Sequence, residues 1–167
     1  MTGTKQLLTD KRLRFISIVC VIALLVNGIS LFKNAQTYCY PRDQAKLLMD
    51  GIAQEKQMVP YLSADTSLKQ SFMQMLDKFV DNCTPFVVRQ LSMYTFFGSF
   101  ICILGVSLIW KLKKRGFYFF LAGTLLGILA PYILFGCTFF SAVIAIFTSF
   151  FWFIFIILFA VNLKYMD

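Results

Sequence analysis

The chain has 167 residues, of which 59% are hydrophobic, only 14% are charged and 20 are phenylalanine. A soluble domain carries about 25% charged residues, so this composition excludes a chain that hides its apolar surface in a core of its own. The net charge of +8 is divided among short clusters beside apolar segments, which argues against nucleic acid as a partner. We therefore expect an all-α membrane protein.

Four apolar segments predict transmembrane helices, because about 20 residues at about 1.5 Å each cross a hydrocarbon core of about 30 Å. The predicted spans are residues 15–32, 91–110, 117–134 and 139–163. The first is longer than the ~7–15-residue apolar part of a cleaved signal peptide, so we expect it to be retained. The last two are separated by a predicted short outer turn at residues 135–138, where glycine interrupts the apolar run.

Residues 33–90 are the one long polar segment, and they predict a helical hairpin outside the membrane. Apolar side chains recur at helical spacing in residues 42–58 and again from Leu68 to Val80, with Pro60 between the two stripes. A segment of this size cannot hold a core of its own. We expect its apolar faces to rest on each other, on the membrane surface or on a partner.

Two cysteines flank this hairpin, Cys39 after the first span and Cys83 before the second. Their matched positions predict a disulfide in an oxidising compartment, which would contribute about 4 kcal/mol in the chain-entropy model. The alternative is a pair of unbonded thiols. No two cysteines are spaced as C-x-x-C, so a catalytic redox role is not expected.

The distribution of charge predicts the orientation of the chain. Residues 1–14, 111–116 and 164–167 together carry nine cations and two acids, whereas residues 33–90 carry seven cations and six acids. Positive residues remain on the cytoplasmic side, so both termini and the 111–116 turn are predicted to be cytoplasmic and the long loop extracytoplasmic. The cations of the turn, which can also contact anionic lipid headgroups, are Lys111, Lys113, Lys114 and Arg115.

Residues that carry catalysis are scarce. The chain has no histidine, and the predicted spans contain no charged residue, although such residues mark proton relays and ion pathways. We therefore expect no enzyme activity, no cofactor and no metal. Asn27 is the one amide deep within a predicted span, and we expect it to form a hydrogen bond in helix packing.

Small residues predict where helices pack, since they let backbones approach closely in lipid. The third span carries a small face of Gly116, Gly123 and Gly127. The fourth span carries Ala142, Ala145 and Ser149. We predict that these two faces pack together; Gly98 and Gly105 of the second span are the alternative partners.

The fourth span is aromatic on every side, which is more surface than a four-helix bundle can bury. We predict that part of it contacts another membrane protein. The residues of this predicted partner surface are Phe147, Phe150, Phe151, Trp152, Phe155 and Phe159.

The last third of the chain resembles a known group. The stretch Lys113-Lys114-Arg115-Gly116-Phe117-Tyr118, the following Gly123, Gly127 and Pro131, and the C-terminal Ala160-Val161-Asn162-Leu163-Lys164-Tyr165-Met166 resemble small uncharacterised multi-span inner-membrane proteins of the Bacteroidota type. The chain departs from that pattern at Phe119 or Phe120, where the group has tyrosine. The resemblance implies no activity, but it implies a bacterial inner membrane and hence a periplasmic loop.

Two classes of function agree with these features. The first is a non-enzymatic accessory or structural subunit of a larger membrane complex for translocation, secretion or envelope assembly. The second is a small homo-oligomeric transporter, channel or lipid-handling protein. Its pore would be lined by Ser99, Ser107, Thr124, Thr148 and Ser149. The lack of charge within the predicted spans favours the first class.

Overall fold

The computed structural model describes the backbone of residues 2–61, 65–136 and 139–166, and the side chains in these ranges except those of residues 2–13, 139–140, 144 and 165. The helices in chain order are α1 (Thr2–Cys39), α2 (Pro41–Met58), α3 (Thr66–Asn82), α4 (Pro85–Trp110), α5 (Arg115–Phe135) and α6 (Phe139–Asn162), with short 3₁₀ helices η1 (Val59–Tyr61) and η2 (Leu163–Tyr165).

Four segments of the described chain are long and apolar enough to cross a membrane. They are Arg14–Cys39 of α1, Pro85–Trp110, Arg115–Phe135 and Ser141–Asn162. The prediction of a helical chain with four helices of membrane-spanning length is therefore confirmed.

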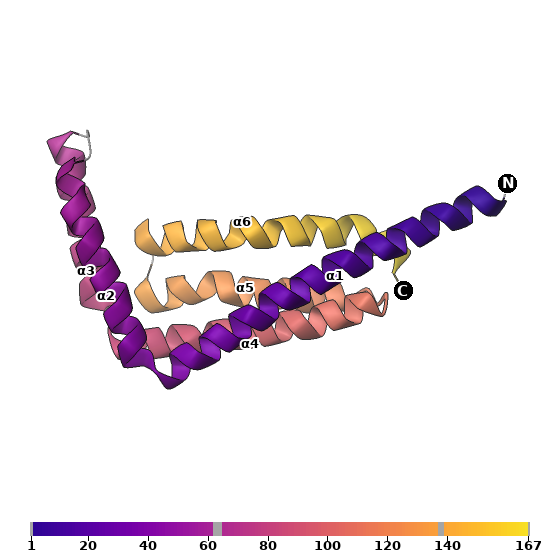
Figure 1. Ribbon diagram of the computed structural model, residues 1–167, viewed down its shortest axis with the longest axis horizontal. Coiled ribbons are helices and arrows are strands. Elements are labelled where there is room, and N and C mark those ends of the chain that lie inside the picture. Colours follow the sequence, from indigo (N-terminus) through magenta and orange to yellow (C-terminus); the bar gives the residue numbers. More distant parts are fainter. Residues whose placement is uncertain (1, 62–64, 137–138, 167) are drawn as a thin grey trace.

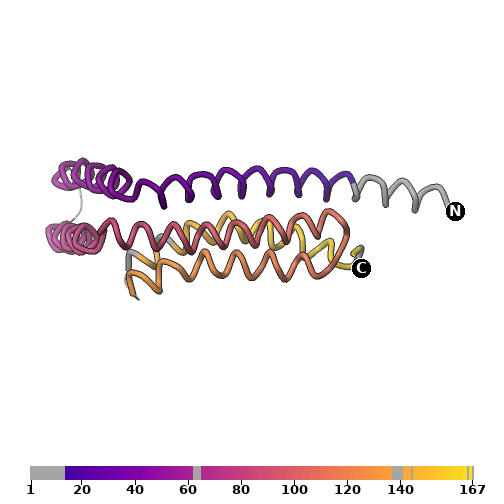
Figure 2. Tube along the Cα trace, turned by 90° about the horizontal axis from the view of Figure 1, so that it is seen from below, coloured from indigo at the N-terminus to yellow at the C-terminus, as the bar shows by residue number. Residues whose placement is uncertain are grey.

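The four long helices run lengthwise beside one another, and α2 and α3 lie across one end of them (Figures 1 and 2). We call this the loop end. The start of α1, the turn between α4 and α5, and the end of α6 share the opposite end, called here the terminal end (Figure 1). Helix α4 packs between α1 and α5, and α6 packs on α5.

Two of the long helices extend at least six residues beyond the spans predicted from hydropathy. Helix α1 continues past residue 32 to Cys39, and α4 begins at Pro85 in place of residue 91. Proline suits the first turn of a helix, where its missing N–H is not needed, and the hydroxyl of Thr84 accepts the N–H of Val87 at 3.3 Å. Hydropathy marks where the chain leaves the membrane, but the hydrogen bonds of a helix continue beyond that boundary.

The predicted turn at 135–138 begins at Gly136, with φ 69°, and its residues 137–138 lie outside the described part.

Glycines bring the backbones of α4 and α5 into contact. A Cβ atom added to Gly105 would lie 2.5 Å from the backbone N of Phe120, and one added to Gly123 would lie 2.6 Å from the carbonyl oxygen of Gly98. A Cβ atom added to Gly116 would lie 2.6 Å from the carbonyl oxygen of Gly105. The prediction that the glycine face of α5 packs on α6 is therefore wrong, and the alternative partners in the second span are correct.

The turn between α4 and α5 is held by a helix-terminating motif. Leu112 has φ 58°, its N–H donates to the Ile109 carbonyl at 2.8 Å, and the Lys113 N–H donates to the Leu108 carbonyl at 3.0 Å. This is the Schellman pattern, which usually has glycine at the left-handed position. Leucine is strained there by about 1 kcal/mol, but its side chain packs against the core of the terminal end, which offsets the strain.

The terminal end holds the larger of the apolar clusters, and α6 joins the bundle there. Phe120 of α5 is fully buried, and its ring lies 5.1 Å from that of Phe159 and 5.9 Å from that of Trp152, edge to face in both cases. Phe155 also packs against this cluster. These aromatic contacts connect α6 to α5 at the terminal end, and Ala145 of α6 is buried as well.

A smaller cluster joins α2 and α3 to the loop end. Ala45, Phe79, Cys83 and Val88 are buried together, and the ring of Phe79 lies 5.8 Å from that of Phe135 at the end of α5. Lys56 and Asp77 form an ion pair between α2 and α3. The apolar faces of these two short helices therefore rest partly on each other and partly on the ends of α4 and α5.

The glycine contacts lead to a first prediction. Gly123→Ala would place a methyl group against the α4 backbone and should destabilise the protein by about 1–3 kcal/mol. Gly127→Ala is the matched control, because it lies one turn further along α5 and a Cβ there has no atom within 4 Å. Thermal unfolding in detergent should show a lower Tm for Gly123→Ala only. Equal Tm values for the two variants would contradict the observed contact.

Candidate functional site

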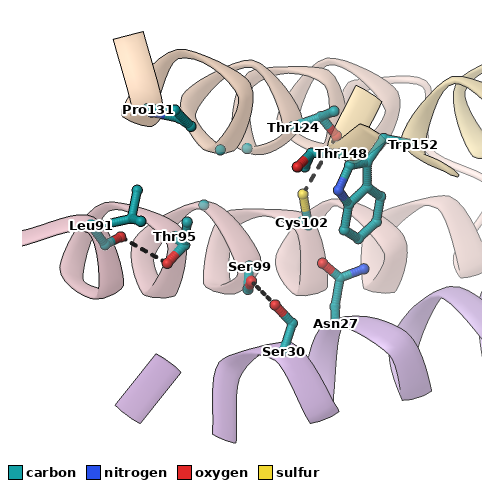
Figure 3. Close-up of a pocket in the computed structure, with 13 residues that line it drawn as sticks. Asn27, Ser30, Leu91, Thr95, Ser99, Cys102, Thr124, Pro131, Thr148 and Trp152 are labelled. Carbon is teal, nitrogen blue, oxygen red and sulfur yellow. Dashed lines mark hydrogen bonds between the residues drawn. The ribbon is translucent and has the colours of Figure 1, made fainter. Parts of the chain in front are cut away.

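A crevice of about 140 Å³ lies between α1, α4, α5 and α6, and its mostly apolar surface carries several polar side chains. Helices α4 and α5 form its floor, and α1 and α6 form its two sides (Figure 3). None of its lining residues is charged. The polar side chains that line it are Asn27, Ser30, Thr95, Ser99, Cys102, Thr124 and Thr148.

The floor of the crevice offers hydrogen-bond acceptors. The Thr95 hydroxyl donates to the Leu91 carbonyl at 2.8 Å, and the Thr124 hydroxyl donates to the Phe120 carbonyl at 2.9 Å. The Ser99 hydroxyl donates to Ser30 Oγ at 3.2 Å, which links α4 to α1. A hydroxyl has a single proton, so these three oxygens can only accept a further hydrogen bond.

Asn27 is the least satisfied group of the crevice. Its side chain is fully buried, and Nδ2 donates to the Ala23 carbonyl of its own helix at 2.8 Å. Its Oδ1 has no hydrogen-bond partner among the described residues, and Figure 3 shows the amide pointing from α1 toward Cys102 and Trp152. An unpaired buried acceptor costs about 1–3 kcal/mol. The packing hydrogen bond expected for Asn27 is therefore not observed between the described residues, because the amide bonds within its own helix and its oxygen has no partner there.

The shape of the bundle explains the position of the crevice. Helices α1 and α6 approach each other at the terminal end and diverge toward the loop end (Figure 1). Trp152 of α6 lines the crevice on the side of the terminal end (Figure 3). Beyond it Gly98, Gly123 and Gly127 line the floor without side chains.

Three of the five hydroxyl residues considered for a polar pathway line this crevice, namely Ser99, Thr124 and Thr148. The other two do not. Ser107 donates to the Ile103 carbonyl within α4 at 2.8 Å, and Ser149 donates to the Ile146 carbonyl within α6 at 3.0 Å.

The predicted aromatic surface of α6 divides into two faces. Phe147, Phe150 and Phe151 point outward and are 67–71% exposed. Trp152, Phe155 and Phe159 instead belong to the terminal-end core or pack on it. Phe159 is buried and is unavailable to a partner, so the prediction that all six form one partner surface is wrong. The cations of the α4–α5 turn, Lys111, Lys113, Lys114 and Arg115, are exposed.

Cys39 and Cys83 are not bonded in the structure. Cys39 is exposed at the end of α1, whereas Cys83 is buried in the loop-end cluster, so the two thiols occupy different environments. The two ends of the loop are connected instead by a contact between Arg89 of α4 and Tyr38 of α1. The guanidinium donates to the phenol oxygen at 3.2 Å, and Arg89 Cζ lies 4.5 Å from the centre of the same ring. The disulfide stays a prediction from the sequence.

Comparison with protein-family models, curated proteins and solved structures gave no match. In the described residues, no three His, Cys, Asp or Glu side chains gather where they could hold a metal ion.

Sequence reasoning considered the hydroxyls of α4, α5 and α6 but missed the α1 side of the crevice. Ser30 follows Asn27 by three residues, and Thr95, Ser99 and Cys102 follow one another at spacings of four and three. Both sets are helical stripes of small polar groups. This periodicity within two apolar helices was the signal that could have identified the site.

The burial of Cys83 leads to a second prediction. Burial raises the pKa of the Cys83 thiol, and the thiolate is the reactive form. Alkylation of Cys83 by N-ethylmaleimide should therefore be slower than that of exposed Cys39. Its rate should also continue to rise at pH values above the pKa of an ordinary thiol. Mass spectrometry of alkylated peptides between about pH 7 and 10 would measure both rates.

Equal rates for the two cysteines at each pH would contradict the burial of Cys83. If neither cysteine reacts until a reductant is added, the disulfide predicted from the sequence is present.

Proposed function

We propose that this protein is a non-enzymatic accessory subunit of a larger bacterial inner-membrane complex for translocation, secretion or envelope assembly. The observation that carries this proposal is an exposed apolar tip on the helices of the loop. Met58 is 69% exposed, Tyr61 is 88% exposed and Leu68 is 62% exposed, and all three lie outside the four membrane-spanning segments. Lipid hydrocarbon explains exposed phenylalanines on a span, whereas these residues belong to helices that are not among the membrane-spanning segments.

The apolar tip of the loop and the outward face of α6 lie on the same side of the protein. Helices α2 and α3 cross the loop end and continue past α6 (Figure 1), whose outward face carries Phe147, Phe150 and Phe151. A membrane partner packed against α6 would therefore meet the tip above it. We propose that α6 and the tip contact the same partner, with the outward aromatic side chains filling its surface by van der Waals packing.

The proposed orientation follows the positive-inside rule. The cations of the turn at 111–115 and the termini are on the cytoplasmic side, where they contact anionic lipid headgroups, and α2 and α3 are periplasmic. The resemblance to inner-membrane proteins of the Bacteroidota type supports this location.

The partner surface gives a third prediction. Affinity purification after gentle detergent extraction should recover the protein in stoichiometric association with a larger complex. Changing both Phe150 and Phe151 to Ala should lower recovery of that complex about tenfold, which corresponds to about 1.4 kcal/mol. The matched control changes Phe97 and Phe100 to Ala, two exposed phenylalanines on α4. Recovery of the wild type only as self-oligomers would reject the accessory role.

The orientation gives a fourth prediction, which is measured on intact and on opened cells. After treatment with a reductant, a membrane-impermeant maleimide should label Cys39 from the periplasm. A variant with Lys113→Cys, in the exposed turn, should be labelled at residue 113 only after the cytoplasmic side is opened. Labelling in the reverse order would invert the proposed topology.

The crevice favours a second function, a small lipid-handling protein, because its mostly apolar lining includes the buried oxygen of Asn27, which has no partner among the described residues. An accessory subunit and a lipid-binding protein are separable, since the partner surface is on the outer face of α6 and the crevice is on its inner side.

A further inference from the structure

We propose that the crevice binds the uncharged, hydrogen-bond-donating head of a membrane amphiphile, with the free hydroxyl of a diacylglycerol as its simplest form. This inference does not require the accessory role, and it specifies the ligand class of the lipid-handling alternative.

The donor character of the ligand follows from the hydrogen bonds already made. Asn27 Oδ1 is buried and unpartnered, and the hydroxyl protons of Thr95, Ser99 and Thr124 are already donated within the protein. The crevice therefore presents oxygen acceptors from α1, α4 and α5, and an O–H or N–H of a ligand would supply the hydrogen bond that Asn27 Oδ1 lacks.

The neutrality of the ligand follows from the lining. A phosphate or carboxylate group needs cationic partners, and an ammonium group needs an acid or an aromatic cage. The lining contains neither Lys or Arg nor Asp or Glu. Desolvating a charge at this depth of a membrane is also costly, whereas a hydroxyl can exchange its water for Asn27.

The size of the crevice limits the head to a few atoms. A volume of about 140 Å³ is similar to that of a cavity of about 150 Å³ that holds benzene. A glyceryl group also has six heavy atoms. A sugar headgroup is too large for this space, and a single water molecule, at about 30 Å³, would leave most of it empty.

The route of entry points to the membrane as the source. The sides of the crevice are α1 and α6, two spanning helices that diverge toward the loop end (Figure 1). On α1 the exposed apolar residues Val26 and Ile29 directly precede Asn27 and Ser30 of the lining. Acyl chains can lie along these residues while the head enters between the helices.

The test compares three molecules on the full-length protein in detergent. Dioleoylglycerol has one free hydroxyl and two acyl chains, triolein has the chains without a hydroxyl, and glycerol has hydroxyls without a chain. Native mass spectrometry should show one bound dioleoylglycerol, and thermal unfolding should show a rise in Tm with that lipid alone. Equal binding of triolein would overturn the hydroxyl recognition, and a response to glycerol alone would overturn the lipid source.

Two asparagines provide a matched pair of variants. Asn27→Leu removes the open acceptor and should lower the affinity for dioleoylglycerol about tenfold, as expected for the loss of one buried hydrogen bond. Asn162 is also buried and makes the same kind of bond, donating from Nδ2 to the Leu158 carbonyl at 2.7 Å, but it does not line the crevice. Asn162→Leu should leave the affinity unchanged. Unchanged affinity of Asn27→Leu would reject the proposal.

A further variant keeps the test decisive if Asn27→Leu does not fold. A Cβ at Gly127 meets no atom within 4 Å, and this residue lines the crevice, so Gly127→Leu should fill the space and abolish lipid binding while the protein remains folded. Retained binding would place the lipid elsewhere. Recovery of the larger complex is measured separately, so a failed lipid test leaves the accessory role standing.

Discussion

The backbones of α4 and α5 touch, and the rest of the bundle is arranged around that pair. Side chains normally keep helices 8–10 Å apart, but Gly98 and Gly105 meet Gly116 and Gly123 with no Cβ atom between them. The resulting seam makes two helices behave as one platform. Helix α1 then packs on the α4 side and α6 on the α5 side, which fixes their order in space.

The two ends of this platform differ in what covers them. At the terminal end, Phe120 fills the space between α5 and α6 and meets Phe159 and Trp152 edge to face. Around the crevice, glycines and short polar side chains take the place of these aromatic residues, and the outer helices diverge toward the loop end. The crevice is thus a consequence of where bulky side chains stop along the same four helices, and the open oxygen of Asn27 lies near that boundary.

Composition and hydropathy were sufficient to predict four spanning helices and two helices in the loop. They could not give the helix ends, because Lys33 and Arg89 are polar yet lie on continuous helix. Glycine spacing identified the packing face of α5 but not its neighbour, since both α4 and α6 carry small residues. The open oxygen of Asn27 could not be predicted either. Whether a buried amide finds a partner depends on the distances between helices, which the sequence does not contain.

The separation of the aromatic core from the crevice also affects how this protein can change over evolutionary time. Substitutions at Phe120 or in the glycine seam disturb contacts on which the whole bundle depends. Thr95, Thr148 and Gly127 line the crevice, and a Cβ atom added at Gly127 meets no neighbouring atom within 4 Å. The fold can therefore be inherited unchanged while the chemistry of the crevice diverges, and related chains should share the seam before they share the ligand.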